Sequence, residues 1–266
     1  MTWASRPLDT PANEVIAAVR GGFTVKSIAT PRAELVTRQK CEWPGFMEEL
    51  ELKPFDHIPV TVEDQIVGVG DRTCGELREL SETMLLASDA SLLSYVEVAD
   101  EKQFAFLVEH NRISGIVTLS DIQKLPVYCV VFALLMSLEM LLMEWIRNRC
   151  REDPDGWLDL LDDKAKRQIE RYWKRGEERN VALDRLSCAS FADELKAAKE
   201  LGLFSASPAD NEALWRLKAL RDRICHGMEI SLTPDRALEV PADVREALRI
   251  QRLLEDELKQ LTPYQS

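Results

Sequence analysis

The chain has 266 residues, of which 45% are hydrophobic and 30% are charged, and its formal net charge is −12. This length is sufficient for two domains with cores of their own. The acid excess excludes a protein that attracts polyanions over its whole surface, so any contact with nucleic acid requires a local basic patch.

Cysteine usage and the N-terminus bear on compartment and metal chemistry. The six cysteines form no C-x-x-C pair, and the chain has only three histidines. We therefore expect neither a disulfide framework nor a metal site. The opening stretch MTWASRPLDTPANE has no basic start and no apolar core, which argues against a signal peptide. These features predict a cytoplasmic protein.

Two similar β-rich segments lie in the N-terminal half of the chain. Residues 55–70 (FDHIPVTVEDQIVGVG) and 104–118 (FAFLVEHNRISGIVT) each contain two apolar runs joined by a polar turn. This pattern is typical of a β-hairpin. Stretches with a helical pattern precede both hairpins, at residues 12–22, 45–52, 74–82 and 91–99. We predict an α+β domain of two β-α-β-β-α units over residues 1–124.

The segment GIVTLSDIQK, residues 115–124, combines a strand end with a helix start. Thr118 ends the strand and Asp121 opens the helix, so a hydroxyl, a carboxylate and helix N-terminal amides converge there. Together with VKSIATPRAELV, FDHIPV and MLLASDASLLSYVEVA, this segment makes residues 12–124 resemble a CBS-domain pair.

The resemblance implies one regulatory ligand site. Thr118 and Asp121 would hold the ribose and phosphate of an adenine nucleotide, and Leu86 would face the adenine. The ligand would be ATP, ADP, AMP or S-adenosylmethionine. The first copy has Gly70 where the threonine would sit, so we expect one competent site at most. Two alternatives stay open: Asp121 only caps the helix, or the pair serves only as a dimerisation scaffold.

Residues 127–150, VYCVVFALLMSLEMLLMEWIRNRC, imitate a membrane span. Ser137, Glu139 and Glu144 interrupt the apolar run, whereas a membrane helix requires roughly 20 apolar residues without central carboxylates. We therefore predict a helix buried in a bundle, no contact with a membrane, and a homodimer with residues 127–146 at its centre.

The C-terminal part, residues 125–266, has an all-helical pattern and predicts a bundle. Five helices are expected, at residues 127–150, 155–180, 190–204, 208–227 and 241–261. Pro154 and Asp155 resemble a start signal for the second helix. Ser190 is the expected N-cap of the third, and Gly202 lies near its end.

The densest basic stretch lies in the second of these helices. Arg167, Arg171, Lys174 and Arg175 recur at helical spacing beside two aromatic residues, Tyr172 and Trp173. Such a pattern suits RNA binding, with cations on phosphates and rings stacked on bases. The alternative is a solvated helix face whose aromatic side chains point inward.

The helix ending in LRDRICHG, residues 220–227, holds the candidate catalytic residues. Its core-facing stripe is apolar, with Leu214, Leu217, Leu220 and Ile224 at steps of three or four. Asp222 and His226 are four residues apart, so they share a face and can form a hydrogen bond. Arg221 lies about 140° away from His226 on an ideal helix, and pairing of two such helices would close that gap.

With its helical context, this motif makes residues 126–262 resemble the HEPN family. The resemblance implies a metal-independent endoribonuclease whose sites form at a dimer interface. His226 would transfer protons at the RNA 2′-hydroxyl, and Arg221 would steady the phosphorane-like transition state. Asp222 would orient His226.

Two functions are compatible with these patterns. One is a ribonuclease regulated by an adenine nucleotide, a combination suited to stress or phage defence. The other is a non-catalytic nucleotide- or protein-binding module attached to a dimerisation scaffold. A catalytic His226 must be open to solvent, whereas packing under apolar side chains would favour the second function.

Overall fold

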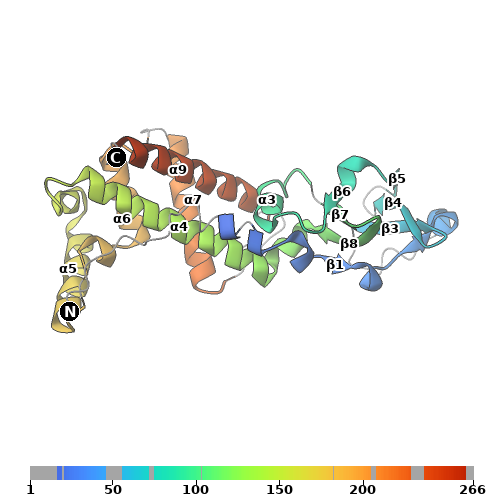
Figure 1. Cartoon of the computed structure of the whole chain (residues 1–266), viewed down its shortest axis with the longest axis horizontal. Helices are drawn as coiled ribbons and strands as arrows, with labels where there is room; N and C mark the ends of the chain where they lie inside the picture. The colour runs from blue at the N-terminus through green and yellow to red at the C-terminus, as the bar shows by residue number, and fades with distance from the viewer. Residues whose placement is uncertain are drawn as a thin grey trace. The chain divides into compact units, whose positions relative to one another are not determined.

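A computed structural model describes most of the chain. The described residues are 17–19, 21–45, 56–71, 75–102, 104–181, 183–204, 208–228 and 237–261. They form an α+β region with two four-stranded sheets, followed by a largely helical region (Figure 1), which confirms the predicted fold class. The described part of the chain divides into two compact units. The α+β unit contains residues 21–127 and 237–241, and the helical unit contains residues 17–19, 128–228 and 242–261.

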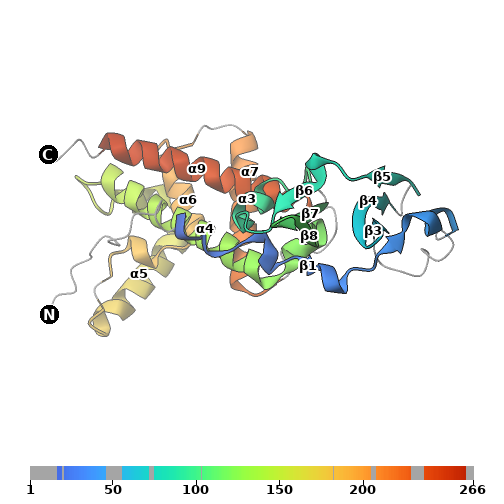
Figure 2. The ribbon, with the colours of Figure 1, turned by 45° about the vertical axis from the view of Figure 1, so that its right-hand side comes forward.

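Each sheet of the α+β unit is built around one hairpin (Figure 2). The first sheet has the order β2-β3-β4-β5, with bounds Arg38–Gln39, His57–Val62, Gln65–Asp71 and Leu77–Glu79. The second has the order β1-β8-β7-β6, with bounds Thr30–Pro31, Arg112–Thr118, Phe104–Glu109 and Leu85–Ala87. Helix α3, Leu92–Glu97, lies between β6 and β7 in the chain and falls within the predicted stretch 91–99.

The two hairpins repeat one another in detail. Each has a register shift at the same point, between Val60 and Thr61 in β3 and between Leu107 and Val108 in β7. Each second strand has a glycine at its fourth position, Gly68 in β4 and Gly115 in β8. A Cβ at Gly115 would lie 2.5 Å from the backbone oxygen of Thr30, and a Cβ at Gly68 would meet that of Arg78. The glycines therefore allow the neighbouring strand to approach.

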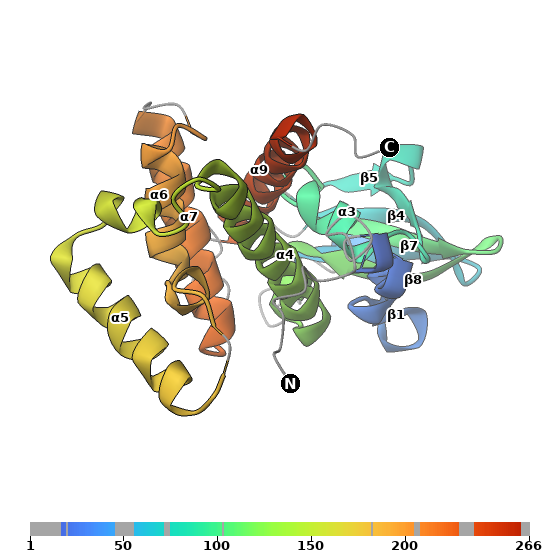
Figure 3. The ribbon, with the colours of Figure 1, turned by 60° about the vertical axis from the view of Figure 1, so that its left-hand side comes forward.

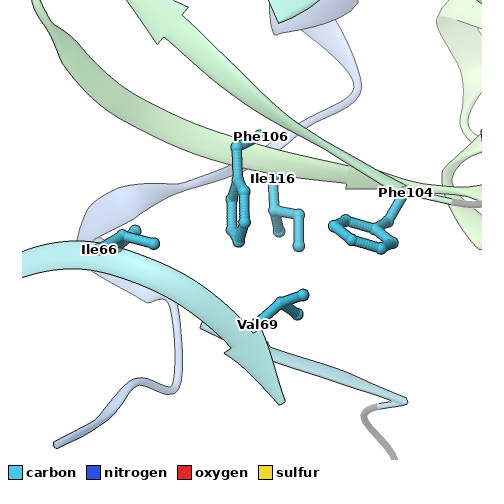
Figure 4. Close-up of a cluster of buried hydrophobic side chains, with 5 residues drawn as sticks. All are labelled: Ile66, Val69, Phe104, Phe106 and Ile116. Atoms are coloured by element: carbon cyan, nitrogen blue, oxygen red, sulfur yellow. The ribbon is translucent and has the colours of Figure 1, made fainter. Parts of the chain in front are cut away.

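A cluster of apolar side chains joins the two sheets (Figure 4). Ile66 and Val69 extend from β4 toward Phe104 and Phe106 of β7 and Ile116 of β8. Phe104 and Phe106 meet edge to face with ring centroids 5.9 Å apart. The alternation of apolar residues in both hairpins thus packs the two halves of the repeat against each other.

The predicted helix at 74–82 is wrong. In its place lie β5 and a short 3-10 helix, Glu82–Met84. These residues form a strand because Leu77–Glu79 pairs antiparallel with β4. Without this pairing, the backbone groups on that edge of β4 would have no strand partner. The predicted helix at 12–22 is described only in part, and residues 46–52 lie outside the described residues.

The described residues of the helical unit include five long helices, seen together in Figure 3. Their bounds are Leu125–Arg149 for α4, Asp163–Glu178 for α5, Phe191–Glu200 for α6, Pro208–Cys225 for α7 and Glu239–Leu261 for α9. The predicted stripe of α7 is buried, since Leu214, Leu217, Leu220 and Ile224 are each at most 9% exposed. α5 lies at the periphery of the unit in Figures 1 and 3.

Helix caps explain where two of these helices begin. The predicted N-cap of α6 is confirmed, because Ser190 and Asp193 form a reciprocal capping box. Gly202, after the end of α6, has a φ of +89°. The start predicted for the second helix at Asp155 is wrong: residues Gly156–Leu160 form a 3-10 helix. α5 begins later because the Asp162 carboxylate accepts the backbone N–H groups of Lys164 and Ala165.

Helix α4 is the one described helix that is long and apolar enough to cross a membrane, and half of its most apolar window is buried. A core helix of a bundle meets the same two criteria. The buried residues of α4 include Ser137 and Glu139. Ser137 donates to the Ala133 carbonyl, and Glu139 pairs with Arg221 of α7. These polar groups therefore find partners inside the helical unit.

Substituting Gly115→Ala should lower the free energy of unfolding by about 1–3 kcal/mol, because the added methyl group meets backbone atoms that cannot rotate away. Gly22→Ala is the matched control, since nothing lies within 4 Å of a Cβ there. Urea unfolding of both variants checks this. Equal stability of the two would contradict the close approach of β1 and β8.

Candidate functional site

An ion pair between a buried glutamate and a half-buried arginine links α4 and α7 of the helical unit. An Nη2 atom of Arg221, on α7, is 3.4 Å from Oε1 of Glu139, on α4. Glu139 is 8% exposed, and the Arg221 side chain is 28% exposed. Nη1 of Arg221 also lies 3.6 Å from Oδ1 of Asp222. The guanidinium is thus held between carboxylates of two helices.

A second buried carboxyl group belongs to the same cluster. Glu194, on α6, is 1% exposed, and its Oε2 atom has no hydrogen-bond partner among the described residues. Burial raises the pKa of Glu194 to about 9, and the charge of Glu139 adds to this effect. The charges of Arg221 and Arg147 oppose the shift. At neutral pH the Glu194 carboxyl is therefore protonated.

His226 is the first residue after α7. Its backbone N–H donates to the Asp222 carbonyl over 3.0 Å, and the following Gly227 has a φ of +63°. The His226 side chain is exposed and forms no hydrogen bond with any described residue. The imidazole is thus open to solvent, as a catalytic histidine requires.

The structure brings only part of the predicted catalytic trio together. Arg221 and Asp222 are in contact, but the carboxylate of Asp222 accepts from Nζ of Lys218 at 2.6 Å and makes no hydrogen bond to His226 within the described chain. Lys218 is one helical turn before Asp222, inside α7, whereas His226 follows the last helical residue. Lys218 therefore takes the hydrogen-bonding position on the Asp222 carboxylate that was predicted for His226.

The predicted RNA-binding residues lie on the surface of α5. Arg167, Arg171, Lys174 and Arg175 are all exposed. Trp173 does not face solvent for stacking: its Nε1 donates to the Leu183 carbonyl over 3.1 Å, and the Arg185 guanidinium lies 4.0 Å from the centre of its ring. Tyr172 is 41% exposed. The expectation that both aromatic rings could stack a base is therefore wrong for Trp173.

The predicted nucleotide site is a saturated helix cap in this structure. Thr118 and Asp121 form a capping box on the 3-10 helix Leu119–Gln123. Oδ2 of Asp121 accepts from the backbone N–H of Thr118 at 2.6 Å and from its hydroxyl at 3.0 Å. Oδ1 lies 2.8 Å from Nζ of Lys124. The carboxylate is 9% exposed, so a ligand would have to displace one of these partners.

Two further residues of the α+β unit, Leu86 and Tyr95, bear on the predicted site. Leu86 is half-buried in β6 and pairs with Leu107 of β7. The Tyr95 hydroxyl is buried and has no hydrogen-bond partner among the described residues. Burial raises the pKa of Tyr95, and the negative charge of Asp121 raises it further. The Tyr95 hydroxyl could therefore still form a hydrogen bond inside the α+β unit.

The hairpin register corrects the comparison of the two copies. His57 pairs with Asp71 at the end of the first hairpin, as Phe104 pairs with Thr118 at the end of the second. Asp71, and not Gly70, therefore occupies the position of Thr118. A carboxylate there would repel a phosphate, so the expectation of one competent site at most is unchanged.

Glu194 and Lys124 are the candidate site residues that the sequence patterns did not single out. A signal for Glu194 exists, because it falls on the same helical stripe as Phe191, Leu195 and Ala198, all of which are buried. A carboxyl group on a core-facing stripe indicates a buried polar cluster. Lys124 gives no comparable signal. Among the described residues, no group of three or more His, Cys, Asp or Glu side chains could hold a metal ion.

Comparisons with known proteins find similarity to CBS domains. The CBS domain of a bacterial CNNM/CorC family Mg²⁺ transporter is 22% identical, with a TM-score of 0.33, over 42% of this chain and 79% of that one. A structure of such a domain in complex with ATP is also 22% identical, with a TM-score of 0.32, over 42% of this chain and 92% of that one. A hemolysin-like protein containing a CBS domain, from Oenococcus oeni, is 13% identical, with a TM-score of 0.30, over 42% and 96%. No protein-family model and no curated protein matches the chain.

The protonated state of Glu194 makes the stability of the protein depend on pH. The folded-state pKa is raised from 4.5 to about 9, so above pH 4.5 the folded chain retains a proton that the unfolded chain has lost. This contribution to stability is complete below pH 4.5 and declines as pH rises toward 9. Glu194→Gln should remove that decline, since the amide cannot ionise.

Thermal unfolding at pH 5.5 and 8.5 measures this effect. We expect the Glu194→Gln variant to gain stability over the wild type at the higher pH. Glu200→Gln, at an exposed position of the same helix, is the matched control and should follow the wild type. A Glu194→Gln variant with the wild-type pH dependence would show that this carboxyl is ionised in the folded chain.

Proposed function

We propose that the helical unit is a metal-independent endoribonuclease of HEPN type. His226 takes the proton from an RNA 2′-hydroxyl, whose oxygen then attacks the adjacent phosphorus. The bond from phosphorus to the 5′-oxygen breaks, and that oxygen takes up a proton. The products are a 2′,3′-cyclic phosphate and a 5′-hydroxyl. Arg221 balances the extra negative charge that the phosphate group carries in the transition state.

The observation that carries this proposal is the placement of two groups at one end of α7. The Arg221 guanidinium is fixed by Glu139, while the His226 ring, five residues later, is exposed and forms no hydrogen bond with the described residues. A fixed cation needs no reorganisation as charge develops, and an exposed imidazole can reach the 2′-hydroxyl of a bound RNA. Asp222, bound to Lys218, is available to orient His226 only after that pair opens.

In a homodimer, Arg221 of one subunit and His226 of the other would come close together. Helix α4 offers an apolar surface for it, with Cys129 exposed, Phe132 40% exposed and Met136 half-buried at steps of three and four residues. Two copies that bury this surface would form a symmetric interface. The protein is proposed to act in the cytoplasm and to need no membrane.

Regulation is assigned to the α+β unit. An adenine nucleotide (ATP, ADP, AMP or S-adenosylmethionine) would bind at Thr118 and Asp121, with Leu86 against the base. The carboxylate and hydroxyl of the cap are suited to ribose hydroxyls once Lys124 turns to the phosphate. A ligand-controlled ribonuclease is useful in stress or phage defence, where cleavage must wait for a signal.

A non-catalytic binding module is the second candidate. One observation favours it: Glu139 and Asp222 both lie within ion-pair distance of Arg221, so much of its charge is already balanced. In that function His226 would have no proton to transfer, and the chain would bind RNA or a protein without cleaving it.

His226→Ala should lower the rate of RNA cleavage by about 100-fold or more, the usual contribution of a general acid or base. Incubation of the wild type and the variant with total RNA, in the presence of EDTA, followed by detection of 2′,3′-cyclic phosphate ends, measures it. His110→Asn is the matched control, an exposed turn residue with a φ of +55° that asparagine tolerates. Absence of cleavage by the wild type, with or without nucleotide, would favour the binding module.

Asp121→Ala should weaken ATP binding about tenfold and also lower stability by about 1 kcal/mol, the usual value of a cap. Calorimetric titration with each of the four ligands, well below the unfolding temperature, separates the two effects. Asp89→Ala, an exposed aspartate, is the control. If the wild type binds none of the four ligands, Asp121 is only a cap and the nucleotide function is excluded.

A further inference from the structure

One side of α5 lines a cationic hollow in an otherwise acidic protein. The hollow has a volume of about 760 Å³. Its cationic lining residues are Lys166, Arg167, Arg171, Lys174, Arg175 and Arg185. Its acidic lining residues are Asp159, Glu170 and Glu178. The chain as a whole carries a net charge of −12, so this local excess of positive charge stands out against the rest of the molecule.

The ion pairs divide these cations into two groups. Lys166 pairs with Asp159 at 3.1 Å, Lys174 with Glu170 at 3.4 Å, and Arg185 with both Glu170 and Asp155. By contrast, three arginines form no ion pair and no hydrogen bond from the guanidinium within the described chain: Arg167, Arg171 and Arg175. They are exposed, and the Arg171 guanidinium lies 5.2 Å from the centre of the Tyr172 ring.

The helix that presents this arginine row is anchored by other residues of its own and of the following loop. Ile169 and Gly176 are buried, and Leu183 lies 3.1 Å from where a Cβ of Gly176 would be. Trp173 is fixed by its hydrogen bond to Leu183 and by the Arg185 guanidinium. The α5 backbone is therefore held in place while the three arginines stay unpaired, although like charges four residues apart destabilise a helix.

The spacing of the row favours one kind of ligand. Residues four apart on a helix rise by about 6 Å, so the row extends over about 12 Å. Guanidinia at such intervals can each meet a different phosphate of an extended chain. Guanidinium forks bind phosphate through two parallel hydrogen bonds. Exposed Tyr172 beside the row offers a face on which a base can stack.

We propose that the α5 row of Arg167, Arg171 and Arg175 binds the phosphate backbone of single-stranded RNA. The inference rests on the proposed ribonuclease function, because it takes RNA as the substrate class and assigns where the strand is held away from the cleaved bond. The contacts are with phosphates, so the row favours no base sequence.

The test uses the full chain with the His226→Ala substitution, so that bound RNA stays intact. Binding of a fluorescein-labelled single-stranded RNA is followed by anisotropy at several salt concentrations. The row variant replaces Arg167, Arg171 and Arg175 with Gln. The control variant replaces three exposed basic residues of the same helical unit with Gln, and these are Arg149, Arg252 and Lys259. Both variants change the net charge equally, and circular dichroism checks their folding.

We expect the row variant to bind at least tenfold more weakly, and the slope of log K against log salt to fall by about 2, or 0.7 for each lost contact. The control variant should change binding much less. Equal losses in the two variants, or no loss in the row variant, would overturn the inference. Competition by free ATP at equal concentration should not release the RNA, and release would indicate a mononucleotide site instead.

The outcomes separate the inference from the proposed function. If the row variant loses binding and the wild type cleaves no RNA, the α5 row is supported as an RNA-binding site and the ribonuclease function is excluded. If the wild type cleaves RNA and the row variant binds it as before, only the role of the α5 row is excluded.

Discussion

A guanidinium in a largely apolar bundle is costly unless carboxylates accompany it, and the helical unit is organised around this constraint. Arg221 extends from α7 to Glu139 on α4, and Glu194 of α6 lies in the same cluster. Three helices that are distant in the sequence thus each contribute a charged or ionisable side chain to one buried cluster. Removing Glu139 would leave a half-buried charge without its main partner, which is far more destabilising than losing a surface pair.

The α+β unit depends on a different constraint, the close approach of strands. Gly68 and Gly115 occupy equivalent positions, and each leaves room for a backbone oxygen of the neighbouring strand. The two copies differ where the hairpins end: Thr118 begins a capping box with Asp121, whereas Asp71 stands at the equivalent position and pairs with Arg78. Packing is therefore alike in the two copies, while the polar chemistry at the strand ends is not.

Local patterns predicted the features that depend on local physics. The hairpins, the Ser190 cap and the buried stripe of α7 all follow from spacing and side-chain type. Two features depend on partners elsewhere in the chain and could not be predicted in this way. Leu77–Glu79 becomes a strand because β4 offers an edge, and Glu139 meets Arg221 only after the bundle folds. A third feature is local: Lys218 and His226 each lie four residues from Asp222, and spacing alone does not indicate which of them contacts its carboxylate. The start of α5 was predicted wrongly for a local reason, because Asp162 is a better N-cap than Asp155.

The charge state of Glu194 links the bundle core to the proposed chemistry. With Glu194 protonated, the only charges beside the Arg221 guanidinium that come from this cluster are those of Glu139 and Asp222, and Glu194 adds no repulsion toward an approaching phosphate. With Glu194 ionised, the cluster would contain a further negative charge in a medium of low polarity, where repulsion is strong. In the proposed ribonuclease, burial of this carboxyl group, which raises its pKa to about 9, would therefore favour an anionic substrate at Arg221 under neutral conditions. A structural necessity of the core, keeping a carboxyl group uncharged, would in this way also serve the proposed binding of RNA.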